Sequence, residues 1–523
     1  MGIYLNPNNT EFYNAVEHSK IYVDKTELIA FTNSVLFGEH RNICVSRPRR
    51  FGKSMAANML VAYYSCGCDS RGLFDNLKIS HTSNYTEHLN KYDVIHVNML
   101  DEYNAAHTVS EMVEALKNKI LWELHEKYGS LRCYDWSDLV MVMKTIHSKL
   151  GHQFIIIIDE WDCIFRENPH DKVVQEQFLD FLRLWLKDKS YVALSYMTGI
   201  LPIKKYGKHS ALNMFDEYSM TNQRELAEYT GFTEEEVRDL CESHDMPYEE
   251  MKKWYDGYDL KGISIYNPRS VVMSITGHDF DNYWTQTETY ESVRTYIEMN
   301  YDGLRDTIIE LIAGERKRID TTTFTNDMVT FEIQDDVLTL LIHLGYLGYD
   351  FNSKEIFIPN YEIREQFIST VRAMGWNDIV KSLQVSDELL NATIQMNESK
   401  VAEIVELVHQ ENTSILQYNN ENSLSCVLSL AYYSAKRSYD MYRELAGGKG
   451  FADLVFVPKK NCQLAAFIVE LKWDKSAETA IDQIRDREYA DCLKSYKGDI
   501  ILVGLNYDKV NKKHECKIEK IKK

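Results

Sequence analysis

Two groups of residues in this sequence have the types and spacing that chemistry on phosphates requires, and the first is Arg47-Pro-Arg-Arg-Phe-Gly-Lys-Ser54. In a P-loop, backbone N–H groups at a helix N-terminus surround phosphate oxygens, a lysine reaches the terminal phosphates and a hydroxyl binds magnesium. Gly52, Lys53 and Ser54 provide that ending, and Arg47 stands where the first glycine is usual. We therefore predict a nucleoside triphosphate site; a basic loop capped by a helix is the alternative.

Two acidic residues downstream support this site. Asp159 and Glu160 directly follow the apolar run Ile155–Ile158. A strand that ends in Asp159 can present this carboxylate to magnesium, and Glu160 can polarise the attacking water. Thr198 ends another short strand, where its hydroxyl can lie near the γ-phosphate. Solvated acids at a strand end and a structural threonine are the alternatives.

The expected nucleotide site thus combines a phosphate loop with residues from two further strands. The residues expected to bind the nucleotide are Arg49, Arg50, Phe51, Gly52, Lys53, Ser54, Asp159 and Thr198, with Ser54 and Asp159 as magnesium ligands and Glu160 as the catalytic residue. Arg47, Arg49 and Arg50 can neutralise phosphate charge or act on a neighbouring protomer of a homo-oligomer. Contact of these arginines with nucleic acid is the alternative.

The second group is Asp453, Glu470 and Lys472. Glu470 and Lys472 are two positions apart on an expected strand, so both project from one face, where Asp453 on a paired strand can meet them. Asp453 and Glu470 can hold magnesium through oxygen ligands, while Lys472 orients or activates a water for attack on a phosphodiester. A solvated strand face is the alternative.

The surrounding pattern predicts elements that can position both groups. The first part of the chain alternates apolar runs with amphipathic ones, which is typical of an α/β domain. Expected strands cover residues 41–46, 93–99, 154–158 and 192–196, and expected helices cover 54–64 and 107–128. The last part repeats this pattern, with strands at 451–458, 464–473 and 500–503 and a helix at 477–490.

Between these parts the sequence is mostly helical. It contains an expected helix at 335–344 and a hairpin at 349–358, which suit either a winged-helix element or a small α+β lid. We predict three domains, at residues 1–215, 216–400 and 401–523, with a linker near the polar stretch 410–422.

Composition limits the classes of function. The chain has 523 residues, of which 44% are hydrophobic and 26% charged, and its net charge of -20 repels polyanions, so any nucleic-acid contact must be local. Of two basic stretches, residues 41–53 and 509–523, we interpret the second as a solvated, frayed terminus. Ten scattered cysteines disfavour a zinc site or a disulfide framework and indicate the cytoplasm. From the pattern of the first residues we expect no signal sequence, and no apolar run reaches the ~20 residues that cross a bilayer.

Several motifs together resemble those of bacterial AAA-ATPase-like proteins that carry a C-terminal PD-(D/E)XK nuclease-like domain. They are Tyr22-Val23-Asp24-Lys25-Thr26, the P-loop, Asp159-Glu160, Thr198-Gly199-Ile200, Trp254-Tyr255-Asp256-Gly257-Tyr258 and Tyr266-Asn267-Pro268. The resemblance covers nearly the whole chain, with an aspartate in the Trp254–Tyr258 motif where these proteins often have glycine. It implies ATP as the nucleotide and makes the first-position arginine normal. It also matches Glu444 to the acid of a preceding helix and Gln483 to a polar residue of the next helix.

The leading hypothesis is an ATPase whose P-loop domain controls a magnesium-dependent nuclease domain that acts on nucleic acid, with DNA preferred to RNA. A nucleotide-dependent switch or interaction protein, whose nuclease-like domain binds without cutting, is the alternative. A small-molecule kinase would use the same Lys53 and Ser54 but needs no nuclease-like domain.

Overall fold

The protein folds into two compact units. Unit 1 comprises Met1–Leu304 and Lys317–Gln366, and unit 2 comprises Arg305–Arg316 and Phe367–Lys523. The computed structural model describes residues 2–203, 212–222, 225–284, 290–325, 328–374, 377–411, 428, 431–447, 450–459, 464–487, 493 and 496–521.

Unit 1 is built around a five-stranded parallel sheet with the strand order β2-β3-β4-β1-β5. The strands are β1 (Asn42–Ser46), β2 (Asp93–Asn98), β3 (Phe154–Asp159), β4 (Val192–Gly199) and β5 (Asp216–Tyr218). The three central strands are buried along their whole length, because helices cover both faces of the sheet. This confirms the α/β prediction for the first part of the chain.

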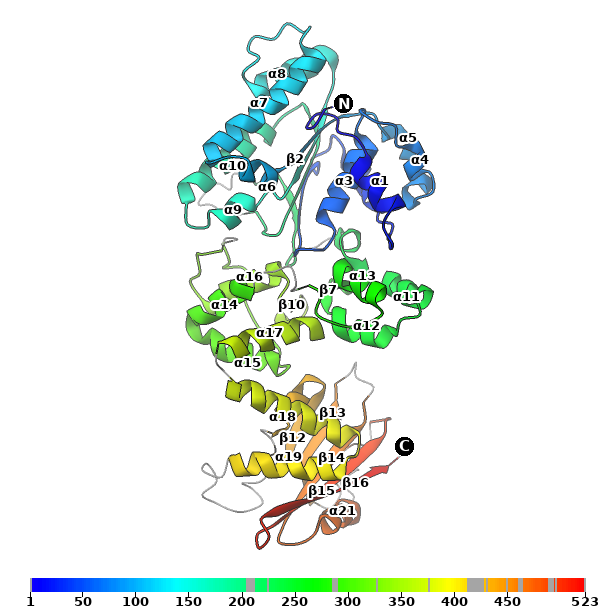
Figure 1. Ribbon diagram of the computed structural model, residues 1–523, viewed down its shortest axis with the longest axis vertical. Helices are drawn as coiled ribbons and strands as arrows, with labels where there is room; N and C mark the ends of the chain where they lie inside the picture. Colours follow the sequence, from blue (N-terminus) through cyan, green and yellow to red (C-terminus); the bar gives the residue numbers. More distant parts are fainter. Residues whose placement is uncertain are drawn as a thin grey trace. The chain divides into compact units, whose positions relative to one another are not determined.

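The helices of unit 1 form two layers, with α1 to α5 on one face of the sheet and α6 to α10 on the other (Figure 1). The first layer is α1 (Thr10–Glu17), α2 (Glu27–Val35), α3 (Lys53–Tyr64), α4 (Arg71–Phe74) and α5 (Tyr85–His88). The second is α6 (Met99–Asn104), α7 (Val109–Tyr128), α8 (Leu139–Leu150), α9 (Cys163–Glu167) and α10 (Lys172–Leu186). None of the helices in the described part of the chain is long and apolar enough to span a membrane.

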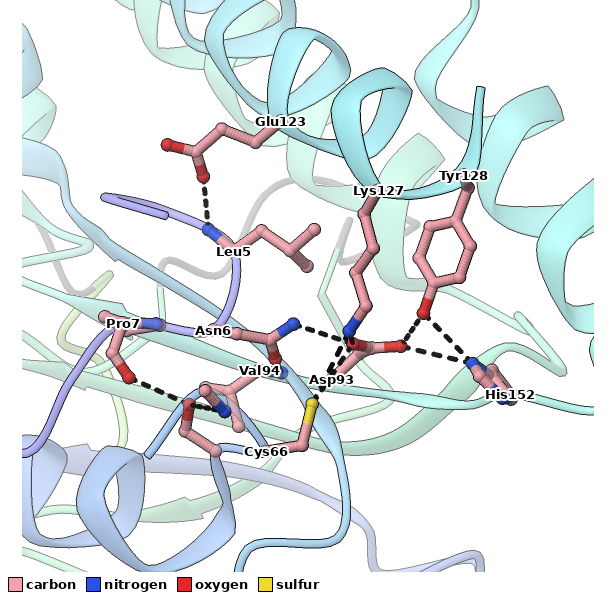
Figure 2. A network of polar contacts seen from close by, with 12 residues as sticks. Leu5, Asn6, Pro7, Cys66, Asp93, Val94, Glu123, Lys127, Tyr128 and His152 are labelled. Carbon is pink, nitrogen blue, oxygen red and sulfur yellow. Dashed lines mark hydrogen bonds and ion pairs between the residues drawn. The ribbon is translucent and has the colours of Figure 1, made fainter. Parts of the chain in front are cut away.

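The N-terminal residues protect the edge of this sheet at β2. Leu5 pairs with Ile95 of β2, and the Glu123 carboxylate accepts the backbone N–H of Leu5 at 2.6 Å. Next to this pairing, Asp93 is 5% exposed and accepts hydrogen bonds from Asn6, Lys127 and Tyr128, as Figure 2 shows. The edge strand is therefore covered and cannot add a further strand there.

The middle of the chain is mainly helical, as predicted. Its helices are α11 (Glu234–Ser243), α12 (Tyr248–Tyr255), α13 (Pro268–Gly277), α14 (Tyr290–Met299), α15 (Leu304–Ile312), α16 (Gln334–Leu344) and α17 (Tyr361–Ala373). Two three-stranded sheets accompany them, one of β6 (Phe232–Thr233), β8 (Ile263–Tyr266) and β7 (Tyr258–Leu260), the other of β10 (Gly348–Asp350), β11 (Glu355–Phe357) and β9 (Lys317–Arg318). The predicted helix and hairpin are α16 and the β10–β11 pair. A role of this element in DNA binding stays untested.

Unit 2 contains a second five-stranded sheet, in the order β12-β13-β14-β15-β16. Its strands are β12 (Tyr439–Gly447), β13 (Gly450–Pro458), β14 (Ala466–Trp473), β15 (Ile500–Asp508) and β16 (Lys513–Ile521). All neighbours are antiparallel except β14 and β15. The interpretation of the C-terminal residues as a frayed end is wrong, because β16 pairs with β15 along its whole length.

Helices cover both faces of the second sheet. Helices α18 (Asn377–Ile394) and α19 (Glu398–Glu411) share a core with alternate residues of β14, and α21 (Ala477–Asp486) packs on the residues between them. The core of unit 2 thus includes α18 and begins before residue 401. The three predicted domains stay a prediction, and most of the predicted linker at 410–422 lies outside the described residues.

Candidate functional site

The P-loop lies between β1 and α3, where the sequence predicted it. Arg50 and Gly52 have positive φ angles of 69° and 83°, which turn the chain sharply into the helix. A side chain at Gly52 would meet nothing within 4 Å, so the backbone conformation, rather than space, favours glycine there. No side chain caps the N-terminus of α3. Its first N–H groups therefore suit an anion.

Lys53 and Ser54 open the helix. Lys53 is 5% exposed, and its Nζ donates to the Pro48 carbonyl at 2.9 Å. Burial lowers the pKa of Lys53, whereas the charges of Glu160 and Asp159 oppose that shift. The Ser54 side chain is exposed, as a residue that binds a diffusible group must be.

The acidic residues and the threonine lie at the carboxyl ends of the central strands, at the same end of the sheet as the P-loop. Asp159 ends β3 and is 3% exposed; its Oδ1 accepts the Thr198 hydroxyl and, at 3.0 Å, the Glu160 N–H. Glu160 has a φ of 53°, a conformation that costs energy in a non-glycine residue. The sheet therefore brings together Lys53, Asp159, Glu160 and Thr198, while their roles stay predictions.

Two functional candidates that sequence reasoning missed lie on and before α9. Arg166, 7% exposed, forms an ion pair with Glu160 and a second one, at 3.4 Å, with the fully buried Asp162. Asp162 Oδ2 also accepts the N–H groups of Ile200 and Leu201 at 3.0 and 2.8 Å. The network thus ties the expected catalytic residue to the chain beyond Thr198. The available signal was an acid four positions before an arginine, just after Asp159-Glu160.

Arg47 differs from the prediction. It was expected to neutralise phosphate charge or to act on another protomer, but its side chain is fully buried. Its guanidinium donates to the carbonyls of Ser46 and Tyr218, both at 3.0 Å. Burial lowers the pKa of Arg47 to about 10. Arg47 therefore braces β1 against β5, whereas Arg49 and Arg50 are exposed and can reach a ligand.

The middle segment of unit 1 packs directly on the phosphate loop. The Phe51 ring is buried against Tyr258, with centroids 5.3 Å apart, and its carbonyl accepts the Gly231 N–H at 2.9 Å. The Trp284 indole N–H lies 3.5 Å from the Arg49 carbonyl. Phe51 thus offers a ligand only its backbone, and Tyr258, from the Trp254–Tyr258 motif, links the loop to the middle segment.

The second candidate site lies on one face of the sheet in unit 2. The pairing of Leu454 with Val469 sets Asp453 beside Glu470, and Asp453 Oδ2 accepts the Leu471 N–H at 2.7 Å. Glu470 and Lys472 are 2% and 4% exposed, and the Lys472 ammonium donates to Glu470 Oε1 at 3.0 Å. The structure therefore brings these three residues together as the strand periodicity predicted.

Electrostatics at this site centre on Glu470. Burial, followed by the nearby charge of Asp453, raises its pKa to about 7, and Lys472 acts in the opposite direction. Gln483 on α21 donates to the same Oε1 that accepts Lys472. The other oxygen, Oε2, is buried and has no hydrogen-bond partner among the described residues. An unpartnered carboxylate oxygen is costly unless a ligand completes it.

The prediction that Glu444 lies on a helix is wrong, whereas Gln483 lies on the next helix as expected. Glu444 was matched to an acid on a preceding helix, but its backbone belongs to β12. The register of β12 and β13, with Leu445 opposite Ala452, sets position 444 across from Asp453. Its side chain lies outside the described residues.

Two residues around the second site were also missed. Asn506 is 1% exposed, faces Lys472 in the pairing of β14 with β15, and bonds both the N–H and the carbonyl of Lys475 at 3.0 Å. A side chain at Gly504 would lie 2.4 Å from the Ala477 carbonyl, so glycine lets α21 approach the sheet. Both residues therefore set the position of the helix that carries Gln483.

Comparisons with known proteins match these two sites. Residues 9–208 match the family described as "Predicted AAA-ATPase", and residues 419–517 match the PD-(D/E)XK nuclease superfamily. The chain combines an AAA-ATPase-like domain with a PD-(D/E)XK nuclease superfamily domain. The resemblance inferred from the motifs is thus confirmed.

Individual relatives and solved structures have low sequence identity to this chain. An "Uncharacterized protein in vnfD 5'region" of Azotobacter chroococcum is 21% identical over 522 residues, which cover 93% of each chain. The Aeropyrum pernix ORC2 structure is 10% identical with a TM-score of 0.26, and covers 68% of this chain and 97% of its own. The structure of Cdc6p from Pyrobaculum aerophilum is 9% identical with a TM-score of 0.22, and covers 71% of this chain and 99% of its own. Neither structural likeness bears on function.

The residues present fit magnesium at both sites. In the AAA-ATPase-like domain, the exposed Ser54 hydroxyl opens α3, and Asp159 Oδ2 carries no hydrogen bond within the described part of the chain. In the nuclease superfamily domain, Glu470 Oε2 is buried and has no hydrogen-bond partner among the described residues. Carboxylate and hydroxyl oxygens are the ligands that magnesium prefers. Ser54 with Asp159, and Asp453 with Glu470, are therefore the candidate ligand pairs.

Proposed function

We propose that this protein binds and hydrolyses ATP in its AAA-ATPase-like domain, and that the nucleotide state controls magnesium-dependent cleavage of nucleic acid by the C-terminal domain. The observation that carries the proposal is that each domain assembles a buried, charged constellation suited to phosphate chemistry. These are Lys53 with Asp159 and Glu160 in unit 1, and Asp453 with Glu470 and Lys472 in unit 2.

In the first site, the N–H groups of the loop and Lys53 would hold the phosphates, which requires Lys53 to leave the Pro48 carbonyl. Magnesium, held by Ser54 and Asp159, would supply charge neutralisation. The Glu160 carboxylate would accept a proton from the water that attacks the γ-phosphorus, so that one P–O bond forms while the bond to the β-phosphate oxygen breaks. Arg166 holds Glu160 in place for that transfer.

In the second site, a metal ion held by Asp453 and Glu470 would supply Lewis-acid chemistry. Lys472 would orient the water that attacks the phosphodiester, and Gln483 would keep the Glu470 side chain in place. One P–O bond forms to the water oxygen, which gives up a proton to bulk water, while the bond to the leaving sugar oxygen breaks and that oxygen takes up a proton from bulk water.

Single substitutions test each site. Lys53→Ala should weaken ATP binding, because it removes a charge-assisted contact to the phosphates, while Lys91→Ala, at an exposed position, should bind ATP like wild type. Glu160→Gln should bind ATP but turn it over slowly. Wild-type turnover by Glu160→Gln would overturn the assignment of this residue.

For the nuclease, plasmid DNA, single-stranded DNA and RNA are each incubated with magnesium or manganese, with and without ATP. Wild type should cut at least one of them, Lys472→Ala should not, and Glu478→Gln, an exposed control on α21, should behave like wild type. Equal backgrounds for wild type and Lys472→Ala would remove the nuclease from the proposal.

One observation favours the second candidate, a nucleotide-dependent switch that binds without cutting. The Lys472 ammonium is held by both Glu470 and the Leu471 carbonyl, at 3.0 and 2.8 Å, so it must be released before it can orient water. Nucleic-acid binding that is the same in wild type and Lys472→Ala, without cleavage by either, would select this candidate.

A further inference from the structure

Four lysines gather at one end of the sheet in unit 2. The loop after β14, the turn between β15 and β16 and the first residue of β16 carry them: Lys475, Lys509, Lys512 and Lys513, together called the lysine tip. All four side chains are exposed, and none of their ammonium groups has an ion pair or hydrogen bond within the described part of the chain. The chain as a whole has a net charge of -20, so a group of four unpartnered lysines is a locally basic surface on an acidic protein.

The lysine tip directly adjoins the candidate nuclease residues. Lys472 pairs with Asn506 in the register of β14 and β15, and Asn506 binds the backbone of Lys475. The turn begins after Asp508, two residues beyond Asn506. Two extended residues span about 7 Å. That is roughly the axial length of two nucleotides of one DNA strand, so a strand cut at Lys472 would lie beside the tip.

Three acidic side chains, Asp474, Asp508 and Glu515, lie at the same end, and none of them forms an ion pair with a lysine of the tip within the described part of the chain. Asp474 accepts the Lys509 N–H at 2.8 Å. Asp508 accepts the N–H groups of Val510 and Asn511 at 2.8 and 3.0 Å. These bonds give the turn a defined shape, and Val510 at its apex is 89% exposed. The tip is thus an ordered projection on which four ammonium groups outnumber three carboxylates.

Other lysines of the same strand contrast with those of the tip. Lys517 forms an ion pair with Glu398 at 3.4 Å, and Lys520 forms one with Asp499 at 2.7 Å. Their charge is balanced within unit 2. The difference provides a matched control, since Lys512 and Lys513 lie just before and at the start of β16 and Lys517 and Lys520 lie further along it.

We propose that the lysine tip is a docking surface for the phosphate backbone of a nucleic acid and holds the strand next to Glu470 and Lys472. The inference rests on the proposed nuclease function, which it deepens by assigning the surface that binds the substrate. Binding through phosphates is independent of sequence and depends steeply on salt.

The test measures binding of labelled duplex DNA, single-stranded DNA and RNA to the full chain in EDTA, so that nothing is cut, at several salt concentrations. A triple variant, K509Q/K512Q/K513Q, is compared with wild type and with the control K517Q/K520Q. Each lost phosphate contact lowers the slope of log K against log salt by about 0.9 for duplex DNA. If the variant and wild type bind equally at 1 M salt, loss of two contacts lowers the binding constant of the variant about 60-fold at 0.1 M salt.

The triple variant should lose both affinity and salt slope on at least one of the three nucleic acids, while the control keeps both. Equal affinity and slope for the triple variant and wild type would overturn the inference, as would an equal loss in the control. Absence of any binding by wild type would overturn it too. Cleavage separates this inference from the proposed function: a wild type that cuts with an unaffected triple variant refutes the docking surface alone.

Discussion

Replacing Arg166 with glutamine tests the buried ion pairs beside the nucleotide site. The substitution leaves two carboxylates without their cation: that of Asp162, which is fully buried, and that of Glu160, whose side chain is 20% exposed. Removal of one partner from a buried ion pair destabilises a protein by about 3 to 5 kcal/mol. Since Glu160 retains some contact with water, we expect a loss of about 3 kcal/mol for unit 1.

The assay is urea unfolding of the full chain with Arg183→Gln as the control. Arg183 pairs with Asp180 at 2.8 Å, but both side chains are about half exposed, at 46% and 58%. Such a surface pair contributes about 0 to 1 kcal/mol. Arg166→Lys, which keeps the charge but not the planar fork, should lie between the two. If Arg166→Gln cost no more than Arg183→Gln, the network would not stabilise the site as argued.

Three further predictions concern stability. His409 and His514 are buried with ring nitrogens 3.1 Å apart, and burial together with His409 lowers the pKa of His514 to about 3. The stability that neutral His514 contributes should therefore be fully present above pH ~6.5 and fall below it, by about 1.4 kcal/mol at pH 5.5. Urea midpoints that do not change between pH 8 and 5.5 would contradict this. Gly199→Ala places a Cβ 2.7 Å from Asp162 Oδ1 and should cost about 1 to 3 kcal/mol, measured by thermal unfolding. Asn506→Ala removes two hydrogen bonds to the part-buried backbone of Lys475 and should cost about 1 to 3 kcal/mol while lowering nuclease activity, and unchanged values would refute its positioning role.

The sequence predicted those parts of the site that depend on local pattern. The apolar run before Asp159 favours a strand buried on both faces, and Gly52-Lys53-Ser54 after a strand favours a phosphate loop that opens a helix. The positions of Glu470 and Lys472 on one face follow from the period of a strand. Each of these inferences needs only residues near one another in the chain.

What the sequence did not predict depends on partners far away in the chain. By sequence alone Arg47 is a candidate ligand-binding arginine, but in the fold its side chain is buried and donates to the carbonyl of Tyr218, which is far away in the chain. The last strand was missed because its lysines dominate the composition, although His514, Cys516 and Ile518 alternate with charged residues as one buried strand face requires. Arg166 belongs to no recognised sequence motif, and its role follows only from its position on α9, where it forms an ion pair with Glu160.

The central claim, that nucleotide binding in one domain controls cleavage in the other, is tested most directly by the rate of nucleic-acid cleavage with and without ATP. The wild-type rate should change with ATP, and the Lys53→Ala rate should be the same in both conditions. A rate that depends on ATP equally in Lys53→Ala and wild type, or that does not depend on ATP in wild type, would contradict the account.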